Sequence, residues 1–348
     1  MNKQDITNFD EKKLSSLLTG NPAYRIRQIF EWLWIKDISS FDDFSNLPKS
    51  LRNKLSSLFY LPAMQIKHQQ VSEDGTVKTA FELIDKQIIE GVLIPDGKRV
   101  TACISSQVGC NVQCSFCATG KMGFSRNLST GEIIFQVKKL NSIAQSIYGK
   151  HLSNIVFMGM GEPLLNYKNV LRASVILTDK NGLAISPQRI TISSVGIADA
   201  IIKLANEKVR FNLAVSLHTV FDAVRNILIP VNKQYPLDKL RKALQYFHSK
   251  TSNRITLEYL LMKGINDSEK DASALAEFTK AFPCKINIIE YNPVKGIAYQ
   301  KPEKESVGKF VDFLKSKNLI VMVRRSRGKD IDAACGQLAT KINRHLRK

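Results

Sequence analysis

Short runs rich in β-branched residues alternate with amphipathic stretches over most of the chain after residue 98. The short runs predict strands, and the stretches with apolar residues at every third or fourth position predict helices. Six strand-and-helix units in this order favour a parallel sheet curled into an open (β/α)6 barrel, a shortened relative of the eight-unit TIM barrel. The expected strands cover residues 99–105, 154–157, 189–193, 212–217, 254–260 and 285–289, with a seventh at 320–324, and the clearest helices cover 133–147, 237–247 and 269–280.

A helical segment precedes this α/β barrel. Helical periodicity at residues 11–18, 24–34 and 51–59 predicts a small accessory domain over residues 1–62. Its lysines and arginines could contact RNA phosphates, or they could form an ordinary solvated face. Both interpretations stay open at this point.

Between the accessory domain and the barrel, apolar residues recur at every second position, which is the period of a strand. Turns are expected at 73–75 and 95–97. Residues 63–98 therefore predict a short antiparallel β extension. The barrel itself is expected over residues 99–325, and a C-terminal segment over 326–348. The three strands of the extension are expected at 64–71, 76–83 and 87–94.

Several polar residues lie where the predicted barrel strands end. Glu162 follows the second strand, Ser193 ends the third, His218 follows the fourth and Asn292 follows the sixth. The carboxyl ends of parallel strands form the active face of barrels and open sheets. We therefore expect these side chains to converge on the loop that follows the first strand.

That loop contains Cys110, Cys114 and Cys117 in a C-x3-C-x2-C spacing. Three thiolates can reach one metal centre but leave it one ligand short, because a closed zinc or iron–sulfur site normally has four. The apolar neighbours Val112 and Phe116 could exclude water. A zinc site completed by a distant residue, or three unrelated buried thiols, are the alternatives.

The charge balance points to a polyanionic partner. The chain has 51 basic and 31 acidic side chains, which leaves a net charge of +20 and an isoelectric point near 9.7. RNA, DNA and an anionic membrane are all compatible with that charge. No apolar run is long enough to span a membrane and the start resembles no signal peptide, so we expect a cytoplasmic protein with reduced cysteines and no membrane partner.

The cysteine loop and two further blocks, residues 158–166 (MGMGEPLLN) and 330–338 (DIDAACGQL), resemble the RlmN-type dual-specificity rRNA and tRNA adenine-2 methyltransferases of the radical S-adenosylmethionine (SAM) superfamily. This resemblance implies a partial radical SAM barrel. It also implies a [4Fe-4S] cluster on Cys110, Cys114 and Cys117, with SAM on the fourth iron. The implied SAM contacts are Gly161, Glu162, Ser193, Ser216, Leu217, His218 and Asn292. From the residues alone, Glu162 could equally be a solvated turn residue, and His218 a structural histidine.

The resemblance also implies a mechanism that uses two SAM molecules per turnover. One SAM methylates the thiolate of Cys335, and a radical from the second takes a hydrogen from that methyl group. The resulting carbon radical adds to the adenine and crosslinks protein to RNA. Cys103 then attacks the sulfur of Cys335, leaving a disulfide, and Glu90 removes the ring proton. Without the resemblance, Cys335 could be an inert apolar thiol and Glu90 a solvent-facing strand residue; Cys284 has no implied reactive role.

The function that follows is methylation of carbon 2 of an adenosine in the peptidyl-transferase centre of 23S rRNA, and of the adenosine 3′ of the anticodon in a subset of tRNAs. The expected partners are these RNAs and an electron donor such as flavodoxin, and we expect a monomer. One alternative is the sister family that methylates carbon 8 of the rRNA adenine, although Pro163 and Val108 disfavour it. Another is a non-catalytic, zinc-stabilised RNA-binding protein. The basic C-terminal tail could position RNA phosphates or could merely solubilise the chain.

Overall fold

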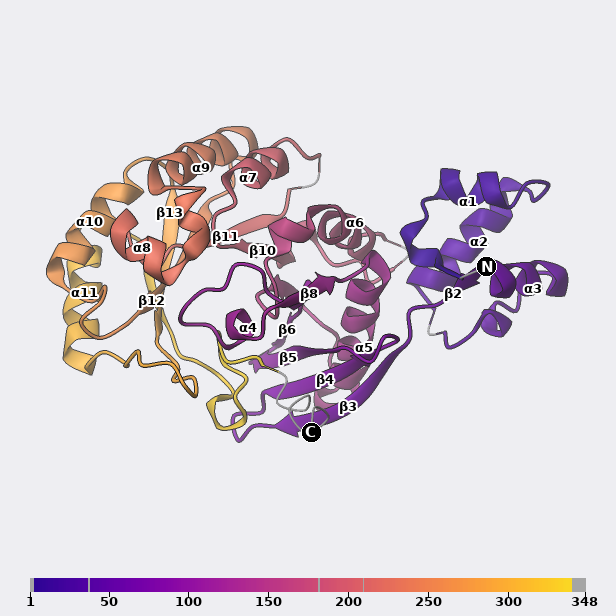
Figure 1. The fold of residues 1–348 in the computed structure, drawn as a ribbon, viewed down its shortest axis with the longest axis horizontal. Helices are drawn as coiled ribbons and strands as arrows, with labels where there is room; N and C mark the ends of the chain where they lie inside the picture. Colours follow the sequence, from indigo (N-terminus) through magenta and orange to yellow (C-terminus); the bar gives the residue numbers. More distant parts are fainter. Residues whose placement is uncertain (1–2, 37, 181, 209, 340–348) are drawn as a thin grey trace.

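The computed structural model describes residues 3–36, 38–180, 182–208 and 210–339. Across these residues ten strands form one mixed sheet in the order β14-β13-β12-β11-β10-β9-β6-β5-β4-β3 (Figure 1). The basic residues Lys341, Arg344, Arg347 and Lys348 of the predicted tail lie outside the described residues. None of the helices in the described ranges is long and apolar enough to cross a membrane.

The parallel part of the sheet confirms the predicted open barrel. Neighbouring strands from β6 to β14 all pair in parallel, and the sheet is not closed because β14 and β3 are its free edges. The helices run along its outer side (Figure 1). The strands are β6 (Arg99–Cys103), β9 (Asn154–Phe157), β10 (Ile190–Ser194), β11 (Asn212–Ser216), β12 (Ile255–Leu261), β13 (Cys284–Glu290) and β14 (Val321–Arg324). The helices are α5 (Thr130–Tyr148), α6 (Tyr167–Leu177), α7 (Ala198–Ala205), α8 (Asp222–Leu228), α9 (Leu237–Thr251), α10 (Glu269–Thr279) and α11 (Lys304–Ser316).

The antiparallel extension continues the same sheet. Its strands β3 (Met64–Val71), β4 (Val77–Leu83) and β5 (Ile88–Asp96) form a meander, and β5 pairs with β6 so that Val92 lies opposite Cys103. The apolar residues of the extension belong to the same buried cluster as those of the barrel. The meander therefore shares the core of the barrel.

The N-terminal helices have a buried cluster of their own, which includes Leu14, Ile29, Leu33, Phe44 and Leu55. The predicted helical periodicity is confirmed, because all of these except Phe44 lie on the inner faces of α1 (Glu11–Leu17), α2 (Ala23–Trp34) and α3 (Lys49–Leu58). A short parallel pair, β1 (Gln4–Asp5) with β2 (Phe59–Tyr60), closes the unit and was not predicted.

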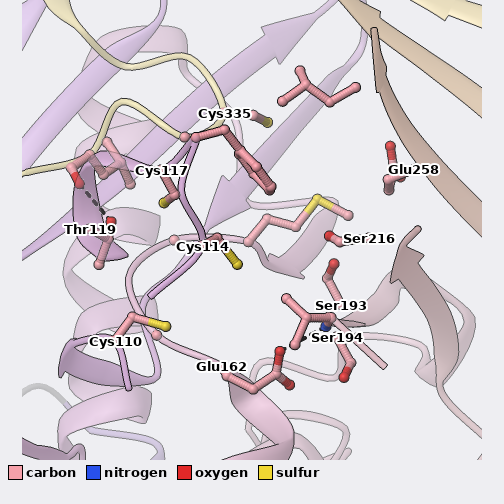
Figure 2. Close-up of a pocket in the computed structure, with 18 of the residues that line it drawn as sticks. Cys110, Cys114, Cys117, Thr119, Glu162, Ser193, Ser194, Ser216, Glu258 and Cys335 are labelled. Atoms are coloured by element: carbon pink, nitrogen blue, oxygen red, sulfur yellow. Dashed lines mark hydrogen bonds between the residues drawn. The ribbon is translucent and has the colours of Figure 1, made fainter. Parts of the chain in front are cut away.

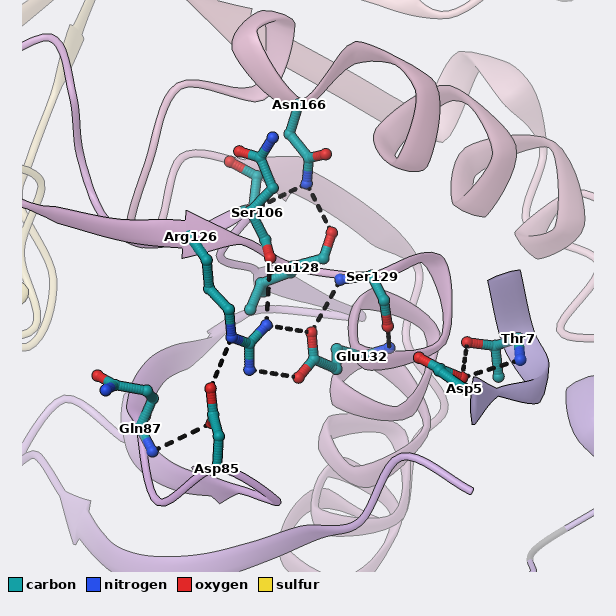
Figure 3. Close-up of polar contacts among 11 residues, drawn as sticks. Asp5, Thr7, Asp85, Gln87, Ser106, Arg126, Leu128, Ser129, Glu132 and Asn166 are labelled. Carbon is teal, nitrogen blue, oxygen red and sulfur yellow. Dashed lines mark hydrogen bonds and ion pairs between the residues drawn. The ribbon is translucent and has the colours of Figure 1, made fainter. Parts of the chain in front are cut away.

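The start of the chain packs tightly against the first turn of α5 (Figure 3). A Cβ atom on Gly131 would lie 2.7 Å from Cβ of Thr7, so only glycine permits this approach. Asp5 holds Thr7 in place, because its Oδ1 accepts hydrogen bonds from Thr7 N at 2.8 Å and Thr7 Oγ1 at 2.6 Å. The N-terminal unit is thereby fixed to the helix that follows the cysteine loop.

A short hairpin supports the cysteine loop. Its strands, β7 (Gln107–Gly109) and β8 (Phe124–Asn127), flank the loop and a single helical turn, α4 (Ala118–Lys121). Arg126 anchors the hairpin, since its guanidinium donates to both carboxylate oxygens of Glu132 at 2.8 Å and to Asp85 at 2.7 Å (Figure 3). The hairpin therefore connects α5 to the β4–β5 turn and holds the loop in place.

Candidate functional site

One cavity opens at the carboxyl ends of the parallel strands. Its walls come from the cysteine loop, from the ends of β9 to β13 and from the segment after β14 (Figure 2). Nine of the residues that the sequence singled out line it. They are Cys110, Cys114, Cys117, Gly161, Glu162, Ser193, Ser216, His218 and Cys335.

The three cysteine side chains of the loop face this cavity (Figure 2). Backbone hydrogen bonds fix the loop at its ends and its middle: Cys110 N donates to Gly123 O at 2.8 Å, and Ser115 N donates to Leu228 O at 3.0 Å. A buried apolar cluster that includes Val112 and Phe116 packs against the cysteines of the loop. The loop is therefore held with its thiols facing the cavity and with its apolar side chains in a buried cluster.

The donor set of the loop fits an iron–sulfur cluster. Three cysteine thiols face one cavity, and cysteine thiolates are the usual ligands of [4Fe-4S] clusters. Burial raises the pKa of Cys110 to about 12 and raises that of Cys114, and the charges of neighbouring thiolates add to the effect. Three thiolates at this site therefore need a cationic centre.

Glu162 is a buried link between two strand ends. Its Oε1 accepts from Leu164 N at 2.9 Å and its Oε2 accepts from Val195 N at 2.8 Å. Burial raises the pKa of Glu162 to about 7, although these hydrogen bonds oppose the shift. The solvated-turn interpretation of this residue is wrong, because Glu162 is only 3% exposed.

Gly161 permits the close contact beside it. Its φ is +96°, and a Cβ there would lie 2.7 Å from Cγ of Gln107. Gln107 Oε1 in turn accepts from Glu162 N at 2.9 Å. A larger residue at 161 would displace the carboxylate that follows it.

His218 is both a cavity wall and a structural histidine. Its Nδ1 accepts from Leu260 N at 3.1 Å, which places the ring proton of the neutral form on Nε2. Burial lowers the pKa of His218 to about 3, so the ring is neutral at physiological pH. The ring also packs edge-on against Phe116, with centroids 4.9 Å apart.

Leu217 and Asn292 lie near the cavity but do not line it. The Leu217 side chain is fully buried in the main core. Asn292 is buried as well, and its Nδ2 lies 3.4 Å from the carbonyl oxygen of Cys335. Both residues flank strand ends that do line the cavity.

Cys335 reaches the cavity from a segment that crosses its mouth. Ala118 N donates to Gly336 O at 2.8 Å, and Thr119 Oγ1 donates to Leu338 O at 2.6 Å, so this segment is bound directly to the cysteine loop. Cys335 keeps an exposed surface toward the cavity mouth. Desolvation by the surrounding protein raises the pKa of the Cys335 thiol, while the positive charge of Arg324 opposes that shift.

Cys103 and Glu90 lie on neighbouring strands at the β5–β6 side of the site. Cys103 is a buried free thiol whose pKa is raised by burial and also by the charge of Cys335, which acts on it from nearby. The pairing of Val92 with Cys103 places Glu90 next to Ser105, and Ser105 Oγ donates to Glu90 O at 2.6 Å. The solvent-facing interpretation of Glu90 is wrong, since it is 5% exposed, but it does not line the cavity.

Sequence reasoning missed two charged residues in this region. Glu258 on β12 lines the cavity and is 3% exposed, and Arg225 on α8 is fully buried behind it. A carboxylate inside the apolar run of β12 is a signal that could have been found. Arg225 follows an ordinary amphipathic pattern, and nothing in the sequence indicates its burial.

Comparisons with known proteins agree with this arrangement. A model of the radical SAM superfamily matches residues 104–276, and a model of the ribosomal RNA large subunit methyltransferase N-terminal domain matches residues 4–61. The first match covers the cysteine loop and the strands as far as β12. The second covers the N-terminal helical unit.

Two similar proteins carry the name "Probable dual-specificity RNA methyltransferase RlmN". The one from Flavobacterium psychrophilum is 46% identical over 97% of this chain and 98% of its own length. The one from Salinibacter ruber is 48% identical over 92% of this chain and 89% of its own. A crystal structure of a radical SAM methyltransferase from Sphaerobacter thermophilus is 39% identical, covers 96% of this chain and 98% of its own, and superimposes with a TM-score of 0.89.

Proposed function

This chain belongs to the RlmN family of dual-specificity RNA methyltransferases in the radical SAM superfamily, and on that premise we propose that it methylates carbon 2 of adenosine in RNA. The substrates would be an adenosine of the peptidyl-transferase centre of 23S rRNA and the adenosine 3′ of the anticodon in some tRNAs. One observation supports this most: Cys335, from a block near the end of the chain, lies at the same cavity as the cysteine loop.

The cavity residues divide into those that would hold the cofactors and those that would act on RNA. Cys110, Cys114 and Cys117 would hold the [4Fe-4S] cluster. The contacts proposed for SAM are Gly161, Glu162, Ser193, Ser216, Leu217, His218 and Asn292. When bound, the cluster and SAM supply a 5′-deoxyadenosyl radical that can take a hydrogen atom from a methyl group on Cys335.

The reacting side chains would be Cys335, Cys103 and Glu90. Cys335 accepts a methyl group from a first SAM, so each turnover uses two SAM molecules. Its carbon radical would then add to carbon 2 of the adenine ring. The ring becomes aromatic again when Glu90 removes the proton from carbon 2 and the unpaired electron passes to a one-electron carrier such as flavodoxin. Cys103 attacks the sulfur of Cys335, the bond between that sulfur and the new carbon breaks, and the carbon takes up a proton to complete the methyl group. The disulfide that forms must be reduced externally.

We further propose the four predicted units as functional domains. Residues 1–62 and the basic tail would contact RNA phosphates, residues 63–98 would carry Glu90, 99–325 would form the catalytic barrel, and 326–348 would present Cys335. The enzyme would act as a monomer in the cytoplasm.

The role of Cys103 can be tested by trapping the crosslink. Cys103→Ala should accumulate a covalent protein–RNA adduct, visible as a band shift on a denaturing gel, because the bond to Cys335 can no longer be resolved. Cys284→Ala removes a thiol elsewhere on the sheet and serves as the matched control. Multiple turnover by Cys103→Ala would remove Cys103 from the mechanism.

The carbon-8 alternative needs a separate measurement. Mass spectrometry of nucleosides from modified RNA, with both positional isomers as standards, should find 2-methyladenosine. Finding 8-methyladenosine would overturn the proposed regiochemistry. Iron and sulfide analysis after anaerobic reconstitution tests the zinc alternative, because a zinc protein would bind neither and remain colourless.

A further inference from the structure

Glu258 is a buried carboxylate on the cavity wall that the proposed mechanism does not use. Its Oε1 accepts from Asn287 Nδ2 at 2.8 Å, and Arg324 Nη1 lies 3.7 Å from the same oxygen. Its Oε2 is buried and makes no hydrogen bond in the structure. A buried carboxylate oxygen without a donor is costly, which suggests that a ligand supplies one.

The carboxylate lies beside the groups that would surround SAM. Glu258 pairs with Ser216 on β11, and its backbone oxygen accepts from Leu217 N at 3.0 Å. Its charge also acts on the thiol of Cys335, and both residues line the same cavity (Figure 2). Glu258 lines the cavity, so a ligand bound there lies within reach of its carboxylate.

The proposed reaction limits which ligand group can lie there. Hydrogen transfer from a methyl group on Cys335 requires the 5′ carbon of SAM, and therefore its ribose, to lie next to that cysteine. The RNA base is expected on the opposite side of Cys335, near Cys103 and Glu90. Three strands, β11, β10 and β9, separate Glu258 from the strand of Cys103.

We propose that Glu258 binds the ribose hydroxyl groups of SAM. This assignment rests on the proposed function, since it uses the position of SAM relative to Cys335. A carboxylate is a suitable acceptor for a vicinal diol, as the acidic residue that binds the ribose in dinucleotide-binding folds illustrates. Asn287 and Arg324 would fix Oε1 and leave Oε2 for the ligand.

The test is a binding experiment that needs neither RNA nor turnover. Reconstituted holoenzyme is dialysed anaerobically against SAM or against its 2′,3′-dideoxy analogue. The wild-type protein should bind SAM at least about tenfold more tightly than the analogue, as expected for a hydrogen bond to a charged acceptor. Glu258→Ala should lose that preference, because it should bind SAM more weakly and bind the analogue as the wild-type protein does. The preference of Glu258→Gln for SAM should be intermediate.

Glu290→Gln is the matched control, because Glu290 ends the neighbouring strand β13, pairs with Lys301 and does not line the cavity. It should bind both ligands as the wild-type protein does. Equal binding of SAM and the analogue by the wild-type protein would overturn the proposal whatever the stability of the variants. An equal loss of affinity for both ligands in Glu258→Ala would also overturn it. Weaker RNA binding by this variant with unchanged SAM binding would do the same.

The outcome is separable from that of the proposed function. A carbon-8 product, or the absence of a trapped adduct, would contradict the proposed function without changing ribose discrimination. Failure of the wild-type holoenzyme to bind SAM at all would contradict both.

Discussion

Single buried side chains beside the cavity wall decide whether the strand ends keep their positions. Arg225 is a fully buried cation whose guanidinium donates to Asn232 Oδ1 at 2.7 Å, to Val195 O at 2.6 Å, and to Ser216 O and Leu217 O at 3.2 Å. Burial lowers its pKa to about 10, so Arg225 stays charged at neutral pH. It thus joins the loops after β10 and β11 at the cavity wall.

Arg225→Met should therefore destabilise the protein by about 3–5 kcal/mol, because several buried carbonyl groups lose a charged donor. Urea unfolding followed by circular dichroism measures the effect. Arg241→Met is the control, since Arg241 lies on the surface in an ion pair with Asp238 and should change stability by less than about 0.5 kcal/mol. A loss below 1 kcal/mol for Arg225→Met would contradict this account.

At the scale of elements, the segment after β14 is held from two sides. On one side the β3–β4 turn contacts it, because Gly328 N donates to Asp74 Oδ2 at 3.0 Å and Ser72 Oγ donates to Asp330 Oδ1 at 2.6 Å. On the other side Thr119, next to the cysteine loop, donates to Leu338 O. Cys335 lies between these two attachments.

Thr119→Val removes the side-chain hydrogen bond of the second attachment with little change of shape, and the bond from Ala118 N to Gly336 O remains. We expect Cys335 to react with iodoacetamide several-fold faster, because this segment opens more often, while global stability falls by about 1–2 kcal/mol. Thr178→Val deletes a comparable hydroxyl-to-carbonyl bond at the end of α6 and should leave the labelling rate unchanged. An unchanged rate in Thr119→Val would show that Thr119 does not hold the segment. Peptide mass spectrometry of the alkylated protein gives the rate for Cys335 alone.

The attachment at Asp74 should be sensitive to acid. Burial raises the pKa of Asp74, but hydrogen bonds from Thr76 and Gly328 outweigh it and lower the pKa from 3.8 to about 2. A lowered folded-state pKa stabilises the protein above pH 3.8, and that stability is lost as the pH falls toward 2. Asp74→Asn should cost on the order of 1 kcal/mol at neutral pH, after allowance for solvent screening, and almost nothing near pH 2.

The measurement compares melting temperatures of the wild type and Asp74→Asn from pH 6 to pH 2. Both proteins are used without metal, so that acid loss of a cluster does not enter. The two curves should converge at low pH. A difference that stays constant over this range would mean that the Asp74 carboxylate is not involved.

At the scale of the whole molecule, the net charge of +20 should govern binding of RNA. If about six phosphates are contacted, affinity for an RNA hairpin should fall on the order of 10³-fold between 50 and 200 mM salt. Fluorescence anisotropy across that range measures the slope. SAM binding, which buries its charges inside the cavity, should change little over the same range, and an RNA affinity independent of salt would contradict the electrostatic interpretation.

The sequence located the long elements well because their signals are local. The strands predicted at 64–71 and 154–157 have those bounds in the structure, and the other barrel strands differ by one or two residues at their ends. The hairpin β7–β8 and the pair β1–β2 were missed. Strands β1, β2 and β7 have only two or three residues, and β8 contains a single apolar residue, so none of them shows a period. The same limit affects the site, where neighbouring Ser216 and Leu217 face the cavity and the core respectively.

The sequence by itself determined the order of strands and helices, the parallel sheet and the inward-facing cysteine loop, because periodicity and spacing are properties of neighbouring residues. Only the tertiary structure decided that Glu258 and Arg225 are buried and that Cys335 closes over the loop. Those features depend on contacts between distant parts of the chain, such as Ser72 with Asp330, which are 258 positions apart. Whether such a side chain is buried depends on which distant residue packs against it. The pattern of neighbouring residues in the sequence does not indicate that distant residue.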